Sequence, residues 1–116
     1  MRFLMTYNSK DTSPPTPEKM EAIGKFSAEM MKSGVLVDTG GILPPSKGAN
    51  IKMAGGKFTV TDGPFPETKE LVIGYAIVQV KSKEEAIEMA RRFMSVAGDG
   101  DGEIRQLFGP ADEHHH

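Results

Sequence analysis

The chain has 116 residues, no cysteine, and three histidines that stand together at positions 114–116. With 14 basic and 16 acidic side chains, its formal net charge is −2. These values exclude a thiolate nucleophile, a disulfide framework and a cysteine-based metal site. They also disfavour nucleic-acid binding, which needs a concentrated basic surface. Because a terminal histidine run is typical of a purification tag, we expect neither a histidine-dependent catalytic triad nor a histidine-bound zinc.

The length of the chain predicts one domain over residues 1–110, followed by a tail over residues 111–116. Leu71 to Val78 is the longest apolar stretch, and it is far shorter than the roughly 20 residues of a membrane-spanning helix. The first residues lack the long apolar region of a signal peptide. We therefore expect a cytoplasmic chain with no membrane partner, no metal and no cofactor.

The first part of the chain predicts a strand, a helix and a second strand. Residues 2–7 are rich in large apolar side chains and predict the first strand. Thr16, followed by a proline, is a typical helix N-cap, and Gly34 is a typical helix stop. Residues 35–39 predict the second strand, and the glycines and prolines of residues 40–45 predict a loop after it.

The middle of the chain predicts a hairpin and then the strongest strand. Residues 51–53 and 57–61 flank a Gly-Gly turn, which is a hairpin signal. Residues 62–66 contain a glycine and two prolines and predict a turn. Residues 71–80 are nearly all apolar and predict a buried strand.

The last part of the chain predicts a second helix and a final strand. Ser82 and Glu85 form a capping box, in which each side chain accepts the backbone N–H of the other residue. Residues 98–102 predict a mobile loop after this helix, and residues 103–108 predict a strand. The resulting order, β-α-β, hairpin, β-α-β, predicts an α+β, ferredoxin-like antiparallel sheet with both helices on one face.

Both faces of the predicted central strand are mostly apolar, with Val72, Ala76 and Val78 on one face and Ile73 and Ile77 on the other. A sheet that has helices on one side normally carries polar side chains on its other side. We therefore expect a homodimer that packs sheet against sheet. The alternative is a monomer in which the loop over residues 41–51 folds over the second face.

The run from Thr61 to Glu70, TDGPFPETKE, resembles the signature of the DGPF-domain branch of the YCII-related family. Further matching features are a first strand that ends in Tyr7 and a Gly-Gly-x-Leu-Pro-Pro segment at residues 40–45. The resemblance covers nearly the whole chain and implies a dimeric α/β-barrel of ferredoxin-like protomers with a cleft between the sheets.

The wider YCII-related family also includes proteins that resemble small-molecule enzymes, among them a ring-modifying dehydrochlorinase. In that wider family, the resemblance implies an active centre made of a His–Asp pair. This chain departs from that pattern, because it has no histidine before residue 114. The His–Asp chemistry is therefore assigned to no residue here.

The family motif also supplies the candidate ligand-binding residues, Asp62, Phe65, Glu67, Lys69 and Glu70. Phe65 stands between two prolines, which fix its direction. Glu67 and Lys69 share one face of an extended chain, and such a pair can bind a polar ligand group or act as a general base. The alternatives are that the motif only shapes a turn and that its charges form a solvated ion pair.

Three functions follow from these features. The first is a homodimer that binds a small molecule in a cleft between the sheets, with the family motif at the mouth of that cleft. The second is a small acid–base enzyme that acts on a cyclic or aromatic metabolite, with Glu67 or Glu70 as the proton carrier. The third is a non-catalytic regulatory module that contacts a partner such as a transcription factor through its sheet edge. Asp38, a polar residue in an apolar strand, either caps a turn or faces the cleft.

Overall fold

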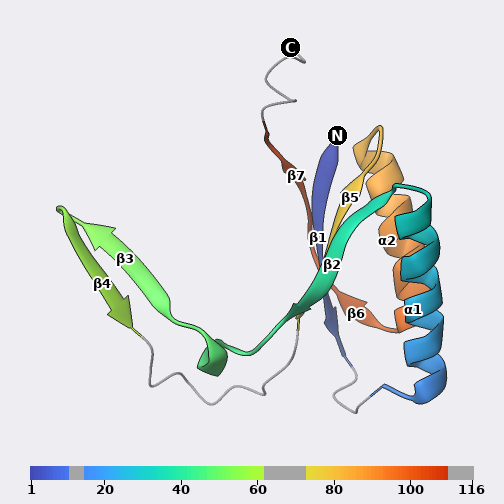
Figure 1. The fold of residues 1–116 in the computed structure, drawn as a ribbon, viewed down its shortest axis with the longest axis horizontal. Coiled ribbons are helices and arrows are strands. Elements are labelled where there is room, and N and C mark those ends of the chain that lie inside the picture. Colours follow the sequence, from blue (N-terminus) through green and yellow to red (C-terminus); the bar gives the residue numbers. More distant parts are fainter. Residues whose placement is uncertain (11–14, 62–72, 110–116) are drawn as a thin grey trace.

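The computed structural model describes residues 1–10, 15–61 and 73–109. In this part of the chain, two helices cover one side of an antiparallel sheet, and a hairpin projects on the other side (Figure 1). The elements are β1 (Arg2–Ser9), α1 (Pro17–Lys32), β2 (Leu36–Ile42), the short 3-10 helix η1 (Pro45–Lys47), β3 (Asn50–Ala54), β4 (Lys57–Thr61), β5 (Ile73–Gln79), α2 (Lys83–Ala97), β6 (Gly100–Asp101) and β7 (Ile104–Leu107).

The sheet has β1 at its centre. Strand β5 pairs with one edge of β1 and β2 pairs with β5, while β6 and β7 pair with the other edge of β1. All of these pairs are antiparallel. The arrangement confirms the predicted α+β, ferredoxin-like fold. The hairpin of β3 and β4 comes between β2 and β5 in the chain, although these two strands are direct neighbours in the sheet.

The core lies between the sheet and the helices. Phe3 of β1 and Val78 of β5 are direct partners in the sheet, and each is only 2% exposed. Ala86 of α2 packs against them with no exposed surface. The ring of Tyr7 meets the ring of Phe93 edge-on, with 5.3 Å between the centroids. Burial of these side chains holds the two helices on one face of the sheet.

Both predicted helix caps form. The Thr16 hydroxyl accepts a hydrogen bond from the backbone N–H of Lys19 at 3.1 Å, and the Ser82 hydroxyl accepts one from Glu85 at 3.2 Å. The reciprocal half of the capping box was predicted incorrectly, because the Glu85 carboxylate accepts the backbone N–H of Lys81 at 2.8 Å. The carboxylate still satisfies a donor at the start of the helix, one residue earlier than expected.

The loop predicted over residues 40–45 is wrong at its start, because β2 continues through Gly40 and Gly41 to Ile42. The two glycines pair with Tyr75 and Gly74 of β5, so they mark a close approach between strands and not a turn. The mobile loop predicted over residues 98–102 is also wrong, because Gly100 and Asp101 form β6 beside the end of β1.

The two helices have 16 and 15 residues. Within the described ranges, neither is long and apolar enough to cross a membrane. The division into one domain over residues 1–110 and a tail over residues 111–116 stays a prediction.

Candidate functional site

The five residues predicted to bind a ligand, Asp62, Phe65, Glu67, Lys69 and Glu70, lie outside the described residues. Their flanking residues are described: Thr61 is the last residue of β4, and Ile73 is the first residue of β5. The family motif therefore follows the hairpin in the chain and precedes a strand of the sheet. Whether these five side chains come together stays a prediction.

The register of the sheet defines the face that has no helix on it. Phe3 and Met5 of β1 are buried toward the helices, so the alternate residues Leu4 and Thr6 lie on the opposite face. Residues directly opposite one another in an antiparallel pair share a face. Extending this rule through the pairings of β1, β5 and β2 gives the open face, which carries Leu4, Thr6, Ile42, Ile73, Tyr75 and Ile77.

Across β1, β5 and β2 the open face is mostly apolar but incompletely covered, and Arg105 of β7 lies opposite Leu4 on the same face. Leu4, Ile73, Tyr75 and Ile77 are partly exposed, and Ile42 is 48% exposed. Both helices lie on the other side of the sheet (Figure 1). The sequence prediction that both sides of the sheet are apolar is therefore supported in three dimensions.

Tyr75 has a specific position on this face. It is the direct partner of Gly40 in β2, and its ring lies over that glycine. A Cβ atom added to Gly40 would lie 2.9 Å from Tyr75 Cε1 and 3.0 Å from the phenol oxygen. The missing side chain at residue 40 therefore makes room for the ring, and the phenol becomes a polar group within an apolar surface.

Polar groups border the apolar part of the open face. At one end, Arg2 donates a hydrogen bond through Nε to the Gln79 side chain at 3.2 Å. Beside Tyr75, the Thr6 hydroxyl accepts the backbone N–H of Glu103 at 3.1 Å. This arrangement suits a ligand with an apolar body and a few hydrogen-bonding groups.

The sequence left open whether Asp38 caps a turn or faces the cleft, and the register of the sheet gives its position. Its register partner is Ile77, so it lies on the side of the open face. Its carboxylate also accepts the backbone N–H of Thr39 at 2.9 Å. The residue is thus at the border of the open face and makes a local backbone hydrogen bond there.

A second surface feature is a shallow groove of about 700 Å³ beside α2, lined in part by Lys10, Ile87, Met94 and Asp99. Lys10 donates its backbone N–H to the carbonyl oxygen of Asp99 at 3.0 Å, which joins the end of β1 to the start of β6. The lining combines apolar helix residues with charged groups.

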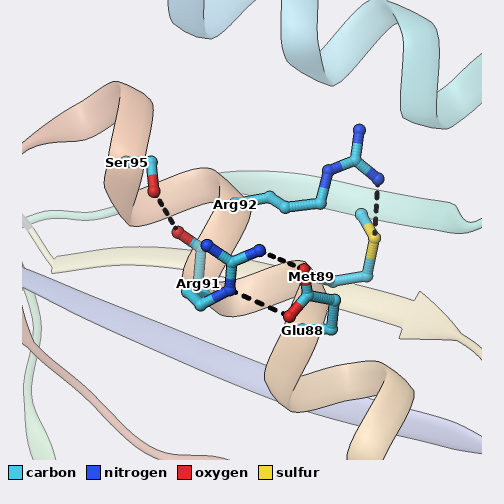
Figure 2. Close-up of polar contacts among 5 residues, drawn as sticks. All are labelled: Glu88, Met89, Arg91, Arg92 and Ser95. Atoms are coloured by element: carbon cyan, nitrogen blue, oxygen red, sulfur yellow. Dashed lines mark hydrogen bonds and ion pairs between the residues drawn. The ribbon is translucent and has the colours of Figure 1, made fainter.

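Arg91 also lines this groove, but its charge is already paired (Figure 2). The guanidinium forms a two-point contact with the Glu88 carboxylate, one arm of which joins Arg91 Nε to Glu88 Oε2 at 2.9 Å. This hydrogen bond lowers the pKa of Glu88, and the same contact raises the pKa of Arg91. Because both groups are exposed, the pair is a surface ion pair and not a binding site for an anion.

Arg92, the next residue of α2, faces elsewhere. It donates to the sulfur of Met89 at 3.9 Å (Figure 2), and its guanidinium lies 5.5 Å from the centre of the Phe26 ring. This cation–π contact links α2 to α1. Arg92 therefore contributes to helix packing, and the groove beside α2 is a weaker candidate for function than the open face.

Within the described ranges, no group of three or more His, Asp or Glu side chains is arranged so that it could hold a metal ion. Sequence reasoning did not single out Tyr75 as a site residue. The signal that marks it is the pair of strands that carry Gly40-Gly41 and Gly74-Tyr75. A glycine opposite an aromatic residue leaves room for the ring to approach the neighbouring strand.

Comparison with known proteins identifies the family. A model of the YCII-related domain matches residues 1–108. The chain belongs to the YCII-related family.

This YCII-related chain is 28% identical over 89 residues to an uncharacterised protein of Rhizobium meliloti (strain 1021), an alignment that covers 76% of this chain and 72% of that protein. Among solved structures, it is similar to CutA of Xylella fastidiosa, with a TM-score of 0.46 and 10% identity over 97% of this chain and 89% of that one. It is also similar to a divalent cation tolerance protein of Thermus thermophilus, with a TM-score of 0.46 and 5% identity over 97% of this chain and 91% of that one.

Proposed function

We propose that this YCII-related protein is a homodimer that binds a small molecule between the open faces of two sheets. The observation that carries the proposal is the apolar open face with Tyr75 at its centre. Exposed apolar surface of this kind is costly in water, and a monomer rarely leaves a large continuous patch uncovered. A second sheet that stacks about 10 Å away covers a large part of such a surface.

The alternative of a loop that covers the face from within the same chain has less support. Residues 41 and 42 belong to β2, and the chain after them leads away from the sheet toward the hairpin (Figure 1). A second copy supplies an equivalent apolar surface without any rearrangement, because a two-fold axis pairs each face with itself.

The ligand is proposed to be a small molecule with an apolar ring or chain and a polar group. Tyr75 provides one aromatic wall and a phenol hydrogen-bonding group. The family-motif residues Phe65, Glu67 and Lys69 are proposed to supply a second aromatic side chain and the charged groups. Asp62 and Glu70 complete this proposed set at the mouth of the cleft.

Native mass spectrometry of freshly purified protein tests the dimer and the ligand together. The expected species has about twice the chain mass of 12.6 kDa, with an additional mass from a retained small molecule. Ile77→Asp places a charge on the open face and is expected to give monomers. Ile87→Asp makes the same change on α2 and is the matched control, expected to stay dimeric.

Two results contradict the proposal in separable ways. A wild-type monomer at micromolar concentration contradicts the sheet-to-sheet dimer. A dimer that carries no additional mass, and that gives the same spectrum after Phe65→Ala, contradicts ligand binding but leaves the dimer standing. Circular dichroism of each variant checks that the fold is retained.

A further inference from the structure

The hairpin of β3 and β4 has one apolar face and one polar face. Its register pairs Ile51 with Val60 and Met53 with Phe58, so these four side chains share one face. The alternate residues, which include Lys52, lie on the opposite face. This is the pattern of a strand pair with one buried face, yet all four apolar side chains are more than half exposed, from 56% for Phe58 to 70% for Ile51.

The hairpin turn is encoded locally. Gly55 and Gly56 have φ of 56° and 79°, the left-handed conformations of the tight two-residue turn that matches the twist of a hairpin. The turn fixes the register, and the register gathers the apolar side chains on one side. A two-stranded hairpin that packs on nothing is only marginally stable in water. The sequence thus builds a hairpin whose apolar face requires a partner.

The connection from the sheet to the hairpin is ordered. After β2 ends at Ile42, Pro44 accepts the backbone N–H of Lys47 at 2.9 Å, and Pro45 accepts that of Gly48 at 3.0 Å. These hydrogen bonds form η1, which joins β2 to β3. The hairpin that follows lies apart from its own sheet, on the side opposite the helices (Figure 1).

The areas of the two uncovered surfaces favour a second copy of this chain as the partner. Four large apolar side chains that are more than half exposed present on the order of 400 Å². A stable dimer buries about 800 Å² on each partner, so the hairpin face alone is too small and the open face is needed as well. Every copy carries both the apolar hairpin face and the open face, so a pair of copies can cover both surfaces at once.

We propose that the β3–β4 hairpin is a dimerisation arm that packs its apolar face on the open face of the second copy. Met53 and Phe58 then form part of the wall of the partner's cleft, together with the partner's Tyr75. This inference rests on the proposed homodimer and adds that each cleft is completed by a segment of the other chain. The partner is a second copy, and not a peptide or a lipid surface.

Sedimentation velocity on a matched pair of variants tests the arm. Phe58→Asp charges the apolar face of the hairpin, and Thr59→Asp places the same charge one residue away on the polar face. Phe58→Asp is expected to raise the dimer dissociation constant by about 30-fold or more, as for a central interface residue. Thr59→Asp is expected to change it by less than about threefold, as for a rim residue.

Disulfide capture gives a second, independent measurement, because the chain has no cysteine of its own. A chain with Met53→Cys is mixed with chains that carry Thr6→Cys, Ile73→Cys or Ile77→Cys on the open face. At least one mixture is expected to give an oxidised dimer that joins the two different chains, since a disulfide forms only where the Cα atoms come within about 7 Å.

The outcomes separate the arm from the dimer. One outcome is a dimeric wild type in which Phe58→Asp and Thr59→Asp change the dimer dissociation constant equally or not at all, and in which no mixed disulfide forms. In that case the arm is wrong and the sheet-to-sheet dimer stands. If Met53→Cys reacts with an open-face cysteine only when both are in one chain, the hairpin folds over its own sheet and the proposal is overturned. A wild-type monomer overturns the arm and the dimer together.

Discussion

The two sides of the central sheet are built by the same strands but are covered in different ways. On one side, Phe3 and Val78 are almost fully buried under α2. On the other side, their neighbours Leu4 and Ile77 are partly exposed, and the hairpin stands apart with its apolar face in solvent. The covered side stabilises the fold of one chain, whereas the open side and the hairpin are surfaces suited to association and ligand binding.

The largest expected effect comes from neighbouring residues that point to opposite sides of β1. Phe3→Ala removes a ring that is 2% exposed, and we expect it to lower the free energy of unfolding by about 3–5 kcal/mol. Leu4→Ala is the control and is expected to cost less than half as much, because Leu4 already meets solvent. Urea unfolding at low, constant protein concentration measures both, and equal losses would remove the distinction between the two sides.

The next effect tests whether Gly40 makes room for Tyr75 on the open side. A Cβ at residue 40 would lie within 3.1 Å of three atoms of the Tyr75 side chain. We expect Gly40→Ala to lower the free energy of unfolding by about 1–2 kcal/mol because the ring must shift. Gly24→Ala is the control of opposite sign, since its Cβ meets open space in α1 and alanine favours a helix.

Adding Tyr75→Leu separates the close contact from a backbone effect. In the double variant most of the Gly40→Ala loss is expected to disappear, because residues in contact are energetically coupled. If the loss is unchanged, the ring of Tyr75 is not what requires glycine at residue 40.

A smaller effect concerns the caps that begin the helices of the covered side. Thr16→Ala and Ser82→Ala each remove a side-chain acceptor from a helix N-terminus. Each is expected to lower the free energy of unfolding by about 1 kcal/mol, which is measured as a lower midpoint of urea unfolding. Thr16→Asn and Ser82→Asn retain the cap and are expected to lose little stability. A loss that the asparagine variants share equally would mean that capping is not the cause.

The smallest effect is on the solvent side of α2, where Arg91 lowers the pKa of Glu88 through a hydrogen bond. A carboxyl whose pKa is lowered by folding stabilises the protein above its unfolded-state pKa and loses that contribution as pH falls through the lowered value. Arg91→Gln is expected to return the pKa of Glu88 toward its ordinary range, as measured by NMR titration. Lys83→Gln on the same helix is the control and should leave the Glu88 titration curve in place.

Much of the fold could be predicted from local patterns. Thr16 and Ser82 mark helix starts because a hydroxyl at the N-cap satisfies a free backbone N–H, and Gly55-Gly56 marks a hairpin because two left-handed residues close it. The wrong predictions concern residues whose conformation is set by pairing with a strand that is distant in the sequence. Gly40 and Gly41 have the composition of a loop, but pairing with β5 makes them strand residues.

The candidate site divides in the same way. The sequence alone determined that both sides of the sheet are apolar, because alternation along a strand assigns side chains to faces. It also determined the hairpin and the family motif that carries Phe65 and Glu67. Only the tertiary structure decided that the Tyr75 ring lies over Gly40 and that the hairpin stands away from its own sheet. Those relations join residues on different strands, and the physical reason is that close packing between strands depends on register and direction in space, which no local pattern specifies.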